Sequence, residues 1–172
     1  DAVERIRLLM NQNKISAEER TVIKPALEKA EKCNGTAVAI RLDSGETVTG
    51  RSSNLMSACS SAVLNAIKSL SSISDDMLLL SPIILAPIIK LKKEVLCEDK
   101  VKLNLGDVLT ALSICAATNP VAEKALDMLV SLRGAEAHSS CILPESDMRY
   151  VPKLGINMTS EPELGTKDLY GF

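Results

Sequence analysis

A single histidine, His138, lies between an acid and a hydroxyl at alternating positions, Glu136 and Ser140. If this stretch is a β-strand, residues two apart share one face, so the three side chains emerge together. The imidazole titrates near neutrality, so we predict that His138 is a catalytic acid or base, oriented by Glu136, with Ser140 binding or attacking. The same pattern also fits a buried or interfacial histidine that a neighbouring carboxylate satisfies. Both interpretations stay open.

The loop 50–54 is a second candidate, because Arg51, Ser52 and Ser53 follow a glycine and precede an expected helix. A guanidinium, two hydroxyls and the helix N-terminus together favour an anionic ligand. Arg133 is predicted to bind the same ligand if the two arginines meet at one edge of the sheet. Serines before a helix are also common N-caps, so capping and anion binding remain alternatives.

The cysteines predict neither a metal centre nor a redox pair. They are odd in number, and no pair has the C-x-x-C spacing. Reduced thiols of this kind indicate a cytoplasmic protein, and we expect no cofactor and no metal. The five residues are Cys33, Cys59, Cys97, Cys115 and Cys141.

Composition places the chain among ordinary globular proteins and excludes two classes of partner. Its 172 residues suit one domain, and 46% are apolar. The 2% aromatic content and the net charge of −2 argue against a nucleic-acid partner, which needs stacking rings and a basic surface. The longest apolar stretch, 77–89, contains Pro82 and Pro87 and is too short to cross a membrane.

Apolar periodicity and turn residues predict an α/β fold. Asp43-Ser44-Gly45 predicts a hairpin turn, Ser16-Ala17-Glu18-Glu19 a capping box, and Asn104 and Asn119-Pro120 two further helix starts. The expected strands span 36–42, 46–50, 77–80, 135–143 and 156–159. The expected helices span 3–10, 16–33, 56–70, 82–96, 108–118, 121–132 and 146–154.

These elements predict a mixed sheet of about four strands with helices on both faces, preceded by N-terminal helices. We divide the chain into an N-terminal helical segment (1–34), an α/β domain (35–160) and a C-terminal tail (161–172). The order of hairpin and helix resembles the start of the cytidine-deaminase-like fold, which is an analogy of topology only. Zinc deamination is not expected, because the helix start Ser57-Ala58-Cys59 lacks the glutamate of that site.

Several stretches closely resemble the bacterial family called domain of unknown function 1846. They are Gly50-Arg51-Ser52-Ser53, 63–68, 112–120, 132–140 and 154–159. Members are about three times longer, so the resemblance implies that this chain is a C-terminal third. It also implies an upstream glycine-rich, lysine-bearing phosphate loop. The family pattern has Cys where Ala135 stands, which weakens a thiol mechanism, and Lys-Thr where Arg51-Ser52 stands, which keeps a cation and a hydroxyl.

Two functions follow as expectations. In the first, the chain is the C-terminal module of a cytosolic bacterial protein that assembles subunits into a homo-oligomer and completes a site with the upstream nucleotide-binding-like region. In the second, it forms part of an enzyme site for a phosphorylated or carboxylated small molecule, with His138 as acid or base. A small anionic ligand is compatible with both.

Overall fold

The computed structural model describes residues 2–12 and 20–163. Its centre is a four-stranded sheet in the order β2-β1-β3-β4. The strands are β1 (Ala37–Arg41), β2 (Thr47–Arg51), β3 (Glu136–Ser139) and β4 (Asn157–Ser160). β1 is antiparallel to both of its neighbours, whereas β3 and β4 are parallel. The sheet is therefore mixed, as the sequence predicts.

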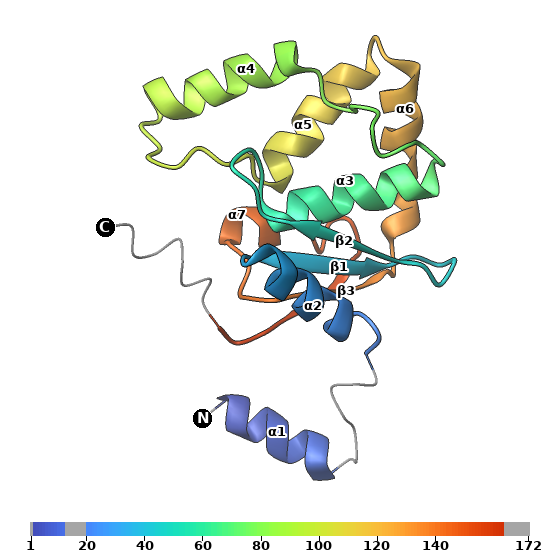
Figure 1. Cartoon of the computed structure of the whole chain (residues 1–172), viewed down its shortest axis with the longest axis vertical. Coiled ribbons are helices and arrows are strands. Elements are labelled where there is room, and N and C mark those ends of the chain that lie inside the picture. Colours follow the sequence, from blue (N-terminus) through green and yellow to red (C-terminus); the bar gives the residue numbers. More distant parts are fainter. Residues whose placement is uncertain (1, 13–19, 164–172) are drawn as a thin grey trace.

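Helices pack on both faces of this sheet. α2 (Ile23–Cys33) lies against one face, and α3 (Ala58–Leu70) lies against the other (Figure 1). The predicted hairpin joins β1 and β2, and Gly45 in its turn has a φ of 86°, a conformation that glycine adopts at low cost. A first helix, α1 (Ala2–Gln12), precedes them.

The remaining helical elements are α4 (Pro82–Lys90), a π-helical turn (Leu91–Val95), α5 (Leu105–Ala116), α6 (Pro120–Asp127), a 3-10 turn (Met128–Leu132) and α7 (Glu145–Met148). Of these, α4, α5 and α6 lie beyond α3, whereas α7 lies beside the sheet (Figure 1). The caps predicted at Asn104 and Asn119 are present. Asn104 and Asp107 form a reciprocal capping box at α5, and the Asn119 side chain accepts hydrogen bonds from the first backbone N–H groups of α6.

The main core lies between the sheet and α3. Val38, Ile40 and Ala137 face this side and pack among buried residues of α3 such as Val63 and Ile67. The side toward α2 holds a smaller apolar cluster of Val22, Ala26 and Ala39. Polar side chains of β3 and β4 occupy the rest of that face, so the α2 side buries less apolar area than the α3 side.

Residues 77–80 do not form the predicted strand, and that prediction is wrong. The Met77 backbone N–H donates to Ser74 in a turn, and the Lys68 ammonium donates to the Asp75 carbonyl. These bonds use backbone groups around the turn, while Leu79 and Leu80 still enter the core. Part of a short apolar run can thus be buried without joining the sheet, while Met77 and Leu78 stay exposed.

Other boundaries differ from their predictions. The predicted strand 135–143 is shorter as β3, and the predicted helix 146–154 is shorter as α7. α2 begins at Ile23 rather than near residue 16, and the predicted capping box at Ser16-Ala17-Glu18-Glu19 lies outside the described residues.

Candidate functional site

His138 is buried on the α2 side of the sheet, within a polar cluster. Its exposed fraction is 3%. Nδ1 lies 2.8 Å from the Thr159 hydroxyl, and Nε2 lies 3.2 Å from the Glu161 carboxylate. The parallel pairing of β3 and β4 places His138 directly opposite Thr159, so the register itself assembles these groups. We call His138, Thr159, Glu161, Arg20 and Glu136 the histidine cluster.

The surroundings favour a neutral imidazole. Burial lowers the pKa of His138, the hydrogen bond and charge of Glu161 oppose that change, and the charge of Arg20 lowers the pKa further. A neutral ring with its proton on Nε2 can donate to Glu161 and accept at Nδ1 from the Thr159 hydroxyl. Arg20 in turn donates to the Thr159 oxygen at 2.7 Å. Both ring nitrogens are therefore satisfied within the fold.

The predicted trio of Glu136, His138 and Ser140 is only partly brought together. Glu136 and His138 share one face of β3, but Glu136 pairs with Arg20 and not with the imidazole. The Ser140 hydroxyl lies beyond β3 and accepts a hydrogen bond from the Ala37 backbone N–H at 3.0 Å. The carboxylate beside His138 is Glu161, which sequence analysis assigned to the tail. The geometry thus favours the satisfied, structural histidine.

A cleft of about 570 Å³ runs along the free edge of β2. Its wall combines polar residues of α2, β2 and α3 with apolar residues from 77–85. The lining residues are Lys29, Thr49, Gly50, Arg51, Ser53, Leu55, Met56, Ser61, Leu64, Asn65, Lys68, Met77, Leu78, Leu79, Leu80, Pro82 and Leu85. Among these, three are cations and none is an acid.

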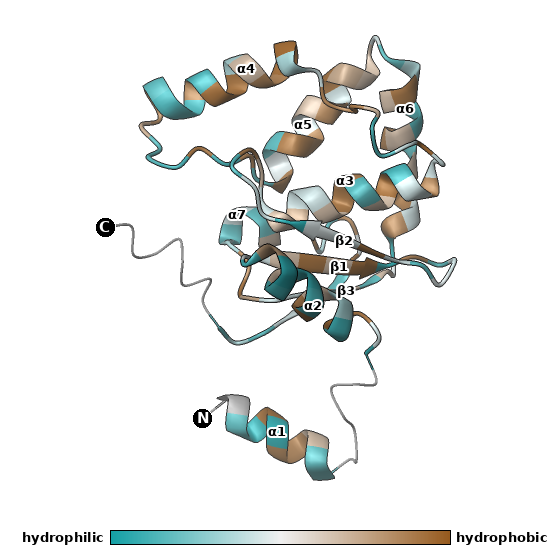
Figure 2. Cartoon of the chain, viewed as in Figure 1, coloured by the Kyte–Doolittle hydropathy of each residue, from teal (hydrophilic) through white to brown (hydrophobic). Residues whose placement is uncertain are grey.

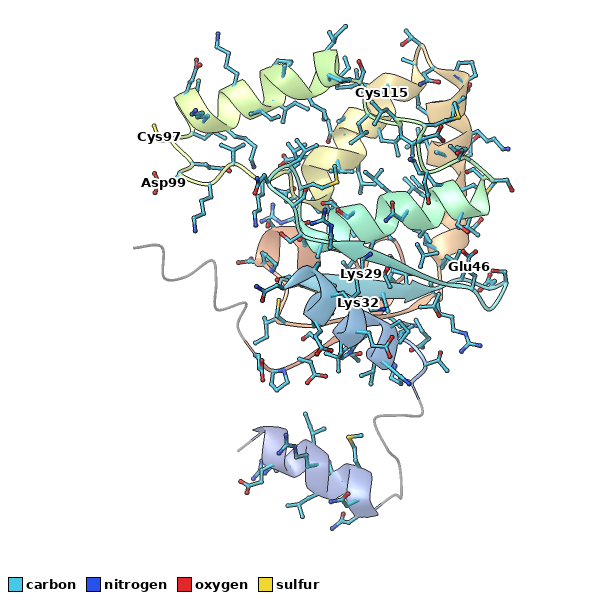
Figure 3. The ribbon with its side chains drawn as sticks, in the orientation of Figure 1. Lys29, Lys32, Glu46, Cys97, Asp99 and Cys115 are labelled. Atoms are coloured by element: carbon cyan, nitrogen blue, oxygen red, sulfur yellow. The ribbon has the colours of Figure 1, made fainter. Side chains whose placement is uncertain are left out.

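Each cation of this β2 cleft comes from a different element. Lys29 extends from α2 toward the sheet (Figure 3), Arg51 is the last residue of β2, and Lys68 belongs to the last turn of α3. In the antiparallel pairing with β1, the backbone N–H groups of Thr49 and Arg51 point away from β1 toward the same free edge. Positive charge and donors therefore converge where a ligand can enter.

The hydroxyls of the two serines predicted to bind an anion, Ser52 and Ser53, already make hydrogen bonds within the chain. The Ser53 hydroxyl accepts hydrogen bonds from the backbone N–H groups of Leu55 and Met56, both at 3.2 Å. The Ser52 hydroxyl accepts from the Lys102 ammonium at 3.1 Å. Of the two, only Ser53 lines the β2 cleft. The cap of α3 is the Ser57 hydroxyl, so the loop serines stabilise a turn before the helix.

Arg133 lies at the opposite end of the sheet from Arg51. β2 and β3 run in the same direction, so both end beside Ala37, where β1 begins. Arg133 precedes the start of β3, at the end where Arg41 pairs with Glu136. About four residues of extended strand, each rising about 3.3 Å, separate the two ends. The two arginines therefore do not meet at one edge.

Groups that hold metals or disulfides do not come together in the described part of the chain. It contains no cluster of histidine, cysteine and acidic side chains suited to a metal ion. All five cysteines are free. Cys97, on the loop after α4, and Cys115, on α5, lie on separate elements far from the sheet (Figure 3). No helix in the described ranges has the length and apolar character needed to cross a membrane.

Comparison with known proteins identifies similar sequences. A family model described as "Domain of unknown function DUF1846, C-terminal" matches residues 18–170. A UPF0371 protein of Clostridioides difficile (strain 630) is 43% identical over 177 residues, which cover 98% of this chain and 35% of the relative. A UPF0371 protein of Clostridium botulinum (strain Eklund 17B / Type B) is 40% identical, covering 99% of this chain and 36% of the relative. The chain thus spans about a third of the length of these relatives.

Proposed function

The chain belongs to the family of DUF1846 C-terminal domains, and we propose that it completes a binding site for a small anionic molecule in the β2 cleft. The observation that carries this proposal is the convergence of Lys29, Arg51 and Lys68 in a cleft that, among the described residues, has no carboxylate in its lining. Cation–oxyanion hydrogen bonds are among the strongest that side chains make, so a phosphate or carboxylate group fits this wall.

The apolar part of the cleft lining indicates the chemical character of the rest of the ligand. Met77, Leu79 and Leu85 line it with apolar surface, and Asn65 donates to the Thr49 carbonyl at 2.9 Å, which satisfies one acceptor of the sheet edge. A molecule with an anionic group and an apolar body fits such a cleft. The phosphorylated or carboxylated small molecules expected from the sequence have this character.

The open β2 cleft fits a binding site that another part of the protein completes. Roughly two thirds of the relatives' length lies outside this chain, and the family resemblance implies a phosphate-type loop there. We propose that this upstream region closes the β2 cleft over the ligand. The free cysteines support a reducing, cytoplasmic environment for the whole protein.

An assembly role has its own support in the apolar surface of α4 and the turns beside it. Much of this region is hydrophobic (Figure 2), and several of its large apolar side chains are exposed; we call it the α4 surface. Its members are Leu78, Ile83, Leu91, Val95 and Leu96. An exposed apolar patch is typical of an interaction site. We propose that the upstream region of the same protein covers it.

Two finer proposals concern chemistry and topology. An acid or base role for His138 is supported by the adjacent Glu161 carboxylate and opposed by the satisfied, buried ring. A cytidine-deaminase-like topology is supported by the helix–hairpin–helix order and by the mixed sheet between helices.

Titration of the full-length protein with pyrophosphate, followed by calorimetry, tests the anion site. Arg51→Gln should weaken binding about tenfold or more, because a hydrogen bond to a charged group contributes about 1.5–3 kcal/mol. Arg133→Gln is the matched control, since it removes an exposed arginine at the other end of the sheet and should leave the affinity unchanged. Binding should also weaken with salt. Equal affinities for wild type and Arg51→Gln would exclude this cleft.

A further inference from the structure

A second, smaller cavity of about 190 Å³ lies where β2 and β3 end and where α3 and α5 begin. Its lining residues are Thr36, Ser52, Ser57, Ala58, Lys102, Asn104, Cys141, Ile142, Leu143, Pro144, Ser146 and Asp147. In open α/β sheets, ligands bind in crevices beyond the carboxyl ends of strands. Water occupies about 30 Å³ per molecule, so the cavity holds a ligand the size of roughly six waters.

Asp147 is the only acid in this lining, and it is fully buried. Its Oδ1 accepts a hydrogen bond from the Leu105 backbone N–H at 2.7 Å, at the start of α5. Its Oδ2 has no hydrogen-bond partner within the described ranges. A buried carboxylate oxygen without a donor costs free energy of folding, so such an atom needs an explanation.

The pKa of Asp147 changes in the direction that its burial predicts. Burial raises the pKa of Asp147 and the charge of Asp107 raises it further, whereas the Leu105 N–H bond to Oδ1 lowers it, as does the nearby Ser57 hydroxyl, which makes no hydrogen bond to Oδ2 in the described structure. Helix capping explains Oδ1 alone, and an asparagine would cap α5 equally well. The free oxygen therefore points to a ligand rather than to the fold.

We propose that this cavity binds a small zwitterion of amino-acid size, whose ammonium group donates to Asp147 Oδ2 and whose carboxylate faces Lys102. Lys102 lines the same cavity, and its ammonium donates to the Ser52 hydroxyl at 3.1 Å. An ammonium and a carboxylate on one small molecule match the acid and the base that line this cavity. The hydroxyls of Thr36 and Ser57 add polar lining. The proposal is independent of the β2 cleft, because Arg51 does not line this cavity.

Three probes of nearly equal size distinguish the contribution of the ligand's ammonium group from that of its carboxylate. L-Alanine carries both groups, propionate lacks the ammonium, and ethylamine lacks the carboxylate. Calorimetric titration of the full-length protein should show saturable binding of L-alanine and at least tenfold weaker binding of the other two, since each loses a charged hydrogen bond worth about 1.5–3 kcal/mol. Absent alanine binding, or equal binding of all three probes, overturns the proposal.

Asp147→Asn keeps the oxygen that caps α5 and removes the charge. The variant should retain or raise the melting temperature and should lose L-alanine affinity at least tenfold. Glu145→Gln, which changes an exposed acid two residues away on α7, is the matched control and should change neither quantity. Unchanged alanine affinity in Asp147→Asn contradicts the proposal.

Lys102→Met provides a second test of the proposal if Asp147→Asn does not fold. This variant should bind L-alanine and ethylamine equally, because the group that distinguishes them is gone. A variant that still prefers L-alanine over ethylamine overturns the assignment of Lys102.

Discussion

At the scale of single residues, His138 shows burial and charge acting in opposite directions on one imidazole. Burial disfavours its charged form, and the Glu161 carboxylate at 3.2 Å favours it. The charge of Arg20 adds to the effect of burial, and the pKa falls below its ordinary value of 6.5. Folding therefore selects the neutral ring. This contrasts with Asp147, where no described donor accompanies the buried oxygen.

A stability measurement across pH tests this account of His138. The unfolded state binds the proton more readily than the folded state, so wild type should lose free energy of unfolding as pH falls through about 6.5. His138→Gln removes this loss. Its destabilisation, about 1–3 kcal/mol at pH 7.5 from broken hydrogen bonds, should shrink at pH 5.5. Urea denaturation at both pH values measures the difference.

Glu161→Gln is the matched variant for this experiment. It removes the one charge that raises the pKa of His138, so the loss of stability toward acid should become steeper than in wild type. If the His138→Gln destabilisation instead grows toward pH 5.5, attraction to Glu161 outweighs burial, and the neutral ring is the wrong description.

At the scale of elements, the contact between β2 and α3 fixes the floor of the β2 cleft. Gly50 faces α3 so closely that an added Cβ would lie 2.6 Å from the Ser61 carbonyl carbon and would collide with the Ala62 backbone nitrogen. Backbone atoms cannot move aside as a flexible side chain can. The glycine is therefore required for close strand–helix packing, and not for a special φ.

Gly50→Ala should consequently destabilise the fold by about 1–3 kcal/mol or more, the usual cost of overpacking. Gly35→Ala is the control, because its Cβ would meet only one atom, at 3.8 Å, and should change stability by less than about 1 kcal/mol. Thermal denaturation of both variants measures the difference. Equal melting temperatures would show that β2 and α3 can separate without cost.

Elements with local signals could be predicted from the sequence, and elements set by long-range pairing could not. The Asp43-Ser44-Gly45 turn and the Asn104 cap depend on neighbours within a few residues, and both are present. The prediction of a strand at 77–80 rests on apolar character alone, which does not distinguish a buried strand from a partly buried turn.

The candidate site residues also divide into those with a local sequence signal and those that only long-range packing brings together. Arg51 was found because a cation in a loop before a helix is a local pattern. Glu161 and Arg20 reach His138 only through the pairing of β3 with β4 and the packing of α2, across 23 and 118 positions of the sequence respectively. Asp147 carries no local signal, because its significance lies in burial and in one unpartnered oxygen.

At the scale of the whole molecule, apolar exposure is uneven. The sheet and α3 enclose a continuous core, whereas on the α4 surface Ile83, in the first turn of α4, is 82% exposed. A π-helical turn follows the other end of this helix. The Lys92 ammonium holds this turn to α5 through the Asp107 carboxylate at 3.0 Å and also pairs with Glu98. The α4 surface is thus anchored in place although its outer side has no apolar cover in the described ranges, which suits a preformed docking face.

Ile83→Glu in the full-length protein tests which partner covers this face. If the upstream region packs there, a buried charge should lower the free energy of unfolding by about 2 kcal/mol or more. Val130→Glu is the control, because Val130 is 71% exposed on the separate 3-10 turn and should change stability by no more than about 0.5 kcal/mol. Light scattering on the same samples reports the mass. Equal small effects of both substitutions contradict an upstream cover, and a halved mass with Ile83→Glu shows instead that a second copy occupies the α4 surface.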